Sequence, residues 1–152
     1  MTQEKIDSAK NGKHQWEKRL LSGLSDSMKF KKIVDALTSK VMSAPYKTDK
    51  VACFEALGFP LGANVAHELK AGLVLVRKIK PSEKHDDISL DFETEMFCDY
   101  DGNEKTFKVL KSAVPSGTRI LIVNDHCEKG EQLKAATTLF TRLGATVIGA
   151  VS

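Results

Sequence analysis

One segment near the C-terminus constrains the fold most. It consists of a short apolar run, a polar stretch with a glycine, and a pattern of apolar residues at helical spacing. Residues Ile120 to Val123 are four consecutive apolar positions, which is typical of a parallel strand buried on both faces. Apolar residues then recur at helical spacing from Gln132 to Leu143. Such a strand, loop and helix form the unit with which α/β proteins bind phosphate, because loop amides and the helix N-terminus converge on one spot.

Other apolar runs indicate a sheet around this unit. Strands are expected near residues 51 to 54, 73 to 76 and 146 to 151, the second of them buried. Helical spacing predicts helices over about 16–24 and from Ser27, a possible N-cap, to about residue 41. A turn over Gly58 to Gly62 should lead into a further helix.

Between the second and third of these strands the pattern changes to alternation. Ile88, Leu90 and Phe92 alternate with polar residues, which predicts a half-exposed antiparallel strand. Residues 100–103 read as a turn and residues 106–110 as the return strand. The expected fold class is therefore α/β: a mainly parallel sheet flanked by helices, with a small antiparallel flap over about residues 82–112.

Composition narrows the classes of protein. The 152 residues suggest one domain over residues 15–152, preceded by a polar, flexible arm over residues 1–14. A net charge of +3 is too small for a dedicated nucleic-acid binder. Three cysteines without a Cys-x-x-Cys pair indicate neither a disulfide framework nor a zinc site. No N-terminal apolar segment is long enough for a signal peptide or a membrane span, so a cytoplasmic protein without a membrane partner is expected.

The segment around the central strand resembles the type I phosphoribosyltransferases, most closely the adenine phosphoribosyltransferases. In that family four apolar residues lead into two acidic residues, two apolar residues and the phosphate loop Ala-Thr-Gly-Gly-Thr. Asn124 and Asp125 match the acidic pair, and residues 128–132 match the loop. The segments 51–62 and 73–80 are similar, in the same order, to the family's carboxylate-containing turn and its Arg-Lys pyrophosphate loop. The resemblance covers roughly residues 28 to 152.

The resemblance implies a set of site residues. It also implies that the protein alone holds no metal, and that Mg²⁺ binds together with phosphoribosyl pyrophosphate if the protein is active. Asp91 aligns with the family's catalytic-loop glutamate, although a solvated side chain on the flap is the plainer interpretation. The three cations after the strand at 73–76 also fit a solvated basic loop. The expected ribose and phosphate residues are Asn124, Asp125, Glu128, Lys129, Gly130, Glu131 and Gln132, and the expected pyrophosphate residues are Glu55, Arg77, Lys78 and Lys80.

Departures from the family pattern divide the functional hypotheses. Leu57 stands where the family has an arginine that would contact pyrophosphate in a bidentate manner. Asn124 loses a charge-assisted hydrogen bond of about 1.5–3 kcal/mol, and Glu128 and Glu131 would each repel a phosphate by roughly 1–4 kcal/mol at 4 Å. With Gln132 in place of a threonine, these losses affect three ligand contacts.

Our first hypothesis is accordingly a degenerate relative, catalytically weak or inactive, that binds a protein partner or another ligand such as a nucleotide. The alternative is an active purine phosphoribosyltransferase that forms AMP and pyrophosphate from adenine and phosphoribosyl pyrophosphate. By the same resemblance, a homodimer or a heteromer with a related phosphoribosyltransferase is expected, and the apolar residues Leu57, Phe59, Pro60 and Leu61 would support it.

Overall fold

The computed structural model describes residues 15–80, 91–99, 102–126 and 130–152. These residues fall into two compact units that divide between Ala36 and Leu37. The flexible arm expected over residues 1–14 lies outside the described residues, and a single domain over 15–152 stays a prediction. No helix in the described residues is long and apolar enough to cross a membrane.

The N-terminal unit contains a helix over residues 15–24 and the first part of α2, Ser27–Met42. Both helices were predicted, but the cap of α2 was not. The backbone N–H of Lys29 donates to Asp26 Oδ1 at 3.0 Å, and the N–H of Phe30 donates to the Asp26 carbonyl at 2.8 Å. Asp26 is therefore the N-cap and the choice of Ser27 is wrong. A carboxylate in this position satisfies a free N–H and also interacts favourably with the helix dipole.

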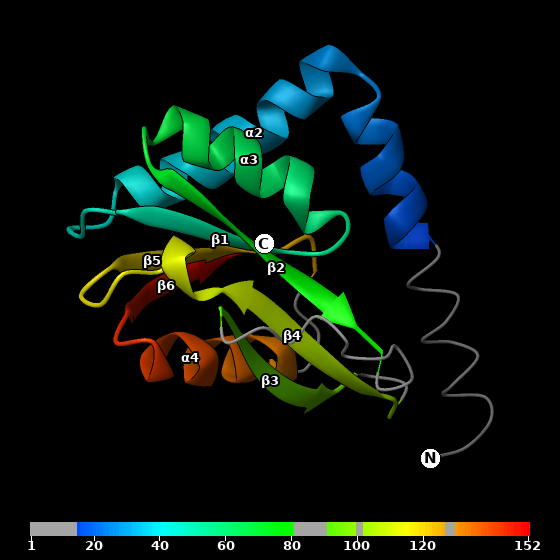
Figure 1. The fold of residues 1–152 in the computed structure, drawn as a ribbon. Coiled ribbons are helices and arrows are strands. Elements are labelled where there is room, and N and C mark those ends of the chain that lie inside the picture. The colour runs from blue at the N-terminus through cyan, green and yellow to red at the C-terminus, as the bar shows by residue number, and fades with distance from the viewer. Residues whose placement is uncertain (1–14, 81–90, 100–101, 127–129) are drawn as a thin grey trace. The chain divides into compact units, whose positions relative to one another are not determined.

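The C-terminal unit is built on one six-stranded sheet with the order β3-β4-β2-β1-β5-β6 (Figure 1). The four strands β2, β1, β5 and β6 are parallel, and β4 and β3 continue the sheet in antiparallel pairs. The predicted α/β class, a mainly parallel sheet with an antiparallel flap, is confirmed. The strands are β1, Lys50–Phe54; β2, Gly72–Ile79; β3, Phe92–Cys98; β4, Glu104–Leu110; β5, Arg119–Val123; and β6, Thr146–Val151.

Two helices lie on opposite sides of this sheet, α3 (Gly58–Glu68) and α4 (Glu131–Arg142) (Figure 1). The expected turn over 58–62 is wrong, because α3 already begins at Gly58. A glycine inside the helix brings it close to β1: a Cβ at Gly62 would lie 2.4 Å from the Cβ of Cys53. The absence of a side chain at this one position therefore sets how closely α3 packs.

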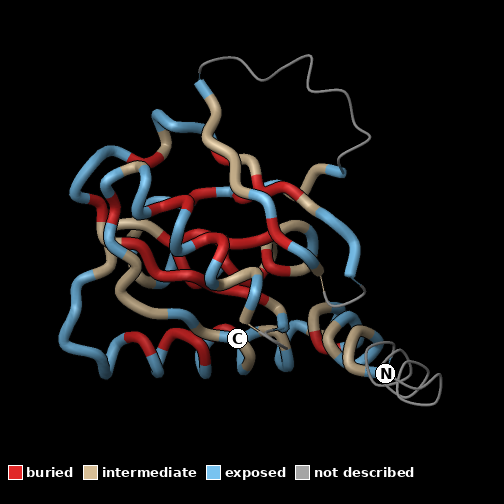
Figure 2. Tube along the Cα trace, turned by 90° about the horizontal axis from the view of Figure 1, so that it is seen from below, coloured by how far each residue is buried: buried red, intermediate tan, exposed pale blue. Residues whose placement is uncertain are grey.

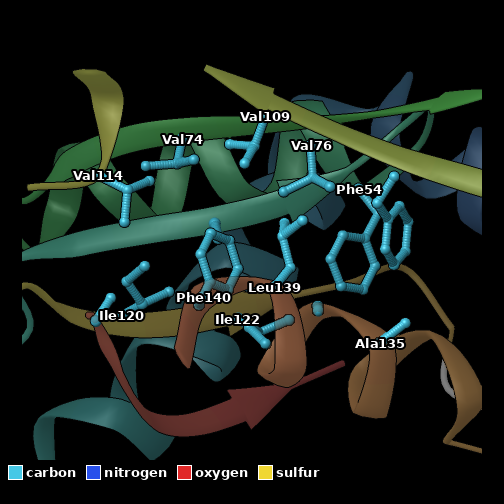
Figure 3. Close-up of a cluster of buried hydrophobic side chains, with 14 of the residues drawn as sticks. Phe54, Val74, Val76, Val109, Val114, Ile120, Ile122, Ala135, Leu139 and Phe140 are labelled. Carbon is cyan, nitrogen blue, oxygen red and sulfur yellow. The ribbon is translucent and has the colours of Figure 1, made fainter. Parts of the chain in front are cut away.

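The hydrophobic core lies between the sheet and α4 (Figure 3). Leu139 and Phe140 of α4 are fully buried against strand residues such as Phe54 and Val76. The ring centroids of Phe54 and Phe107 are 4.7 Å apart and the rings are stacked, which links the parallel strands to the flap. Figure 2 shows that the buried residues concentrate on the strands and on one side of α4.

The expectation that the strand near residue 73 is buried is correct for one of its faces only. Val74 and Val76 are buried, whereas Leu73 and Leu75 are 40% and 46% exposed. Among the described residues, β4 pairs with Arg77 to Ile79 of β2, and Leu73 and Leu75 lie outside this ladder.

The predicted flap strand is only partly tested, and the observed strand extends beyond it. Residues 88 and 90 lie outside the described residues, and β3 begins at Phe92, where the prediction ended. Glu93 and Glu95 of this strand form ion pairs with Arg142 of α4. Arg142 Nε lies 3.1 Å from Glu93 Oε1, and Arg142 Nη2 lies 2.8 Å from Glu95 Oε2. The return strand is confirmed as β4.

Candidate functional site

The order of the strands marks one edge of the sheet as the place for a ligand. The chain passes from β1 to β2 on one side of β1, and β5 then lies on the other side, so the direction of winding switches between β1 and β5 (Figure 1). Ligands of doubly wound sheets bind outside the carboxyl ends of the strands at such a point. Glu55 directly follows β1, Asn124 and Asp125 follow β5, and Lys78 is near the end of β2.

Glu55 connects the ends of β1 and β2. Its Oε2 accepts a hydrogen bond from the backbone N–H of Lys78 at 2.9 Å, and its Oε1 lies 3.7 Å from Arg77 Nη2. Its own N–H donates to the carbonyl of Val76 at 3.1 Å. This carboxylate therefore holds the backbone from which the cations extend.

The three cations predicted as one group do not share a face of the sheet. Alternation along β2 places Lys78 on the same face as Val76, and its Nζ lies 6.0 Å from the ring centroid of Phe54. Arg77 lies on the other face, where its register partner is Lys108 and its side chain is 67% exposed. Lys80 is exposed.

Asp125 is the carboxylate best placed to contact a ligand hydroxyl. Burial raises the pKa of Asp125, while the backbone N–H groups of Asp125 and His126 and the charge of Lys78 act in the opposite direction. An ionised carboxylate in a partly buried position is a strong acceptor for hydroxyl groups. Asp125 and Lys78, which follow or end strands far apart in the sequence, thus lie near enough for their charges to interact.

Asn124 is more deeply buried than its neighbour, with 7% of its surface exposed. Its backbone N–H donates to the carbonyl of Val151 at 3.0 Å, and its side-chain Nδ2 donates to the carbonyl of His126 at 2.5 Å. A Cβ at Gly58 would lie 3.4 Å from Asn124 Oδ1. The closeness of Gly58 to Asn124 was not predicted, because Gly58 was interpreted as part of a turn.

The expected phosphate loop is only partly described, since Glu128 and Lys129 lie outside the described residues. Gly130 precedes α4 with a φ of 75° and no side-chain cap, a conformation for which glycine is suited. Glu131 is exposed, and Gln132 Oε1 is buried without a hydrogen-bond partner among the described residues. The start of α4 therefore follows Asp125 closely in the chain, and the N-terminus of a helix is a position suited to an anion.

Asp91 is not brought to this edge. It is exposed, and its carbonyl accepts a hydrogen bond from the N–H of Lys111 at 2.8 Å. Asp91 directly precedes β3, and β4 and β2 lie between β3 and β1 in the sheet. A catalytic role for Asp91 stays a prediction. Within the described residues, no group of three His, Cys, Asp or Glu side chains is placed to hold a metal ion.

Comparison with known proteins identifies the family. The model of the phosphoribosyl transferase domain matches residues 21–152. The adenine phosphoribosyltransferase of Bradyrhizobium sp. strain ORS 278 is 37% identical over 127 residues, which are 84% of this chain and 66% of that protein. The chain thus spans slightly less than two thirds of this relative. The crystal structure of adenine phosphoribosyltransferase from Rhodothermus marinus superimposes with a TM-score of 0.71 at 27% identity, covering 85% of this chain and 68% of that one. Because the family model covers most of its length, the chain belongs to the phosphoribosyl transferase domain family.

Proposed function

We propose that this chain is an adenine phosphoribosyltransferase domain that forms AMP and pyrophosphate from adenine and phosphoribosyl pyrophosphate. The observation that carries the proposal is the placement of Asp125 and Lys78 together at the carboxyl edge of the sheet, beside the switch point. The similar proteins bear the name of this activity. They favour the active enzyme over our first hypothesis of a degenerate, inactive relative, since nothing in them indicates a loss of activity.

Each group at the edge has a role in this reaction. Asp125 accepts hydrogen bonds from the ribose hydroxyls and so fixes the sugar, and its negative charge favours the cationic sugar that develops as the bond to pyrophosphate breaks. Lys78 faces the negative charge of the leaving pyrophosphate. The amides at the start of α4 bind the 5-phosphate at the opposite end of the sugar. Glu55 acts indirectly, by holding the backbone of Lys78.

Mg²⁺ fits this site as part of the substrate complex. The described residues offer no cluster of three metal ligands, so oxygen atoms of the pyrophosphate would supply its inner ligands. When bound, the ion neutralises the charge that develops on the leaving group.

The departures from the family pattern point to weak substrate binding. Leu57 contributes no side-chain cap to α3 and replaces a charged contact to pyrophosphate. The loss of one charge-assisted hydrogen bond costs about 1.5–3 kcal/mol, or about 10–150-fold in affinity. We therefore propose a high KM for phosphoribosyl pyrophosphate.

The test is AMP formation from adenine, millimolar phosphoribosyl pyrophosphate and Mg²⁺, followed by chromatography, with hypoxanthine as the comparison base. Asp125→Asn should lower kcat/KM by about 10–150-fold, as expected for one charge-assisted bond. Asp35→Asn is the matched control, because Asp35 is an exposed carboxylate on α2 that pairs with Lys31. Absence of AMP, or an Asp125→Asn variant as active as the control, would refute the proposed reaction.

We also propose that the protein forms a homodimer. Leu61 does not support an interface, because it is only 3% exposed, but Leu73 and Leu75 present an apolar surface on β2. Light scattering after gel filtration should give twice the chain mass, and Leu75→Lys should shift it toward the monomer. A monomeric wild-type protein would leave the heteromer with a related phosphoribosyltransferase as the alternative. A cytoplasmic location stays an expectation from the sequence.

A further inference from the structure

The side chain of Asn124 has a fixed orientation in the segment that leaves β5. Its Nδ2 lies 2.5 Å from the carbonyl oxygen of His126. A carbonyl oxygen only accepts hydrogen bonds, so the amide nitrogen and not the amide oxygen must face it. The hydrogen bond from the Asn124 side chain to the His126 carbonyl thereby closes a short ring that includes the backbone of Asp125.

The opposite side of the same amide faces the start of α3. Oδ1 of Asn124 is buried without a partner among the described residues, and it would lie 3.4 Å from a Cβ at Gly58. The backbone N–H of Asn124 is already bonded to Val151 of β6 at 3.0 Å. Two hydrogen bonds thus hold Asn124, one to β6 and one to the carbonyl of His126, and its amide oxygen lies beside the beginning of α3.

We propose that Asn124 is a positioning residue whose amide donor fixes the turn around Asp125. An aspartate at position 124, as in the family pattern, would then impair the site whenever it is ionised. An ionised aspartate has no hydrogen to donate. Two oxygen acceptors would then face each other across the 2.5 Å that now separates Nδ2 from the carbonyl. A protonated aspartate, in contrast, donates through its O–H and reproduces the contact.

The charged groups around residue 124 set the pH at which this change occurs. On its own segment, Asp125 would raise the pKa of a neighbouring carboxyl, while a protonated His126 would lower it. From the other elements, Lys78 of β2 would lower it and Glu55 after β1 would raise it. The start of α3 contributes no charged side chain here, since Gly58 is the residue next to Oδ1. Burial adds a further rise above the usual value of about 3.9.

This role rests on the proposed function, because the turn matters to catalysis only if Asp125 holds the sugar. In this role Asn124 holds the turn and does not make the ribose contact expected from the family pattern, because its Nδ2 is bonded to the carbonyl of His126. Its effect should therefore appear in the KM for phosphoribosyl pyrophosphate more than in kcat.

A suitable control lies on the exposed side of α3. Asn64 also donates through its side-chain Nδ2 to a carbonyl, that of Pro60, at 2.8 Å, but this contact is exposed. Asn64→Asp makes the same chemical change where water can solvate the charge. It should leave kcat/KM within about twofold of the wild type at every pH.

The experiment compares Asn124→Asp with the wild type between about pH 5 and about pH 8.5, a range in which a raised aspartate pKa would be crossed. The ratio of wild-type to variant kcat/KM should rise at least about tenfold across this range, and the rise should be in KM. A flat ratio, or a variant that equals or exceeds the wild type at the higher pH, would overturn the proposal.

Thermal unfolding without ligand separates this proposal from the proposed function. The midpoint of Asn124→Asp should fall below that of the wild type by a margin that grows with pH, by about 3 °C or more across the same range. Asn64→Asp should show no such growth. If no AMP is formed, the proposed function fails and this series alone decides the role of Asn124: a growing margin supports it, and a constant margin overturns it.

Discussion

Substitution of Gly62 by alanine tests how closely α3 packs against the sheet. The added Cβ would stand 2.4 Å from the Cβ and 2.7 Å from the Sγ of Cys53, whereas carbon atoms in contact lie about 3.5–4.0 Å apart. Cys53 is fully buried in β1, and its Cβ is fixed by the backbone. Rotation of the Cys53 side chain therefore relieves only the contact with sulfur, and α3 must move away from the sheet by about 1 Å.

Two effects of opposite sign contribute to the free energy of unfolding. Alanine is favoured over glycine inside a helix by about 1 kcal/mol. Insertion of a methyl group into a filled space costs about 1–3 kcal/mol, or more where the backbone must shift. Because the contact here is with a Cβ on a central strand, we expect the upper end of that cost. The net result is a destabilisation of about 1–2 kcal/mol.

Urea unfolding followed by circular dichroism measures this change. The control is Gly149→Ala on β6, where the nearest atom to the new Cβ is 3.9 Å away. Cys53→Gly should be strongly coupled to Gly62→Ala in a double-mutant cycle, because it removes the opposing Cβ. A Gly62→Ala variant as stable as the wild type, or more stable, would refute the packing argument and leave helix propensity as the dominant effect.

Three further predictions follow from the charges and from the flap. Because burial raises the pKa of Asp125 and the charge of Lys78 opposes this, kcat/KM should fall as the pH decreases, and Lys78→Met should move that decrease to higher pH; an unmoved profile would contradict the contact. Burial raises the pKa of Cys53 to about 12 from 9.0, so thiolate formation in the unfolded chain should lower stability as pH rises above 9, by about 1.4 kcal/mol at pH 10. Cys53→Ala should abolish this alkaline loss, and a thiol reagent should label the exposed Cys98 of the native protein but not Cys53. Arg142→Met should lower the unfolding free energy by about 1 kcal/mol through loss of its two carboxylate contacts on β3, and equal stability of both proteins in low and high salt would exclude that role.

The sequence was sufficient to locate most secondary structure. The apolar runs near residues 51, 73, 120 and 146 are all strands, because an apolar run without polar residues fits only a buried strand or a short core helix. The strand at 92–98 was not predicted beyond its start for a local reason. Glu93 and Glu95 read as solvent-facing residues, and only their contact with Arg142, almost fifty positions later, makes them part of a packed face.

The candidate site was predicted in part. Asp125, Glu55 and Lys78 do lie at the carboxyl edge, since each directly follows or ends a parallel strand. The sequence did not reveal that Arg77 and Lys78 face opposite sides of the sheet. This follows from the alternation of side chains along a strand, because β2 extends through both residues. It also did not place Asp91, whose position depends on the register of the flap.

By itself, then, the sequence determined which segments form strands and helices and which charged residues stand at their ends, because hydrophobic periodicity and chain breaks are local properties. Only the tertiary structure decided which of these residues meet. The hydrogen bond from the Lys78 amide to Glu55 and the electrostatic contact of Lys78 with Asp125 each join different strands. The fit of Gly62 against Cys53 depends on how closely a helix packs on the sheet. Such contacts depend on strand order, register and side-chain direction, which no local pattern encodes.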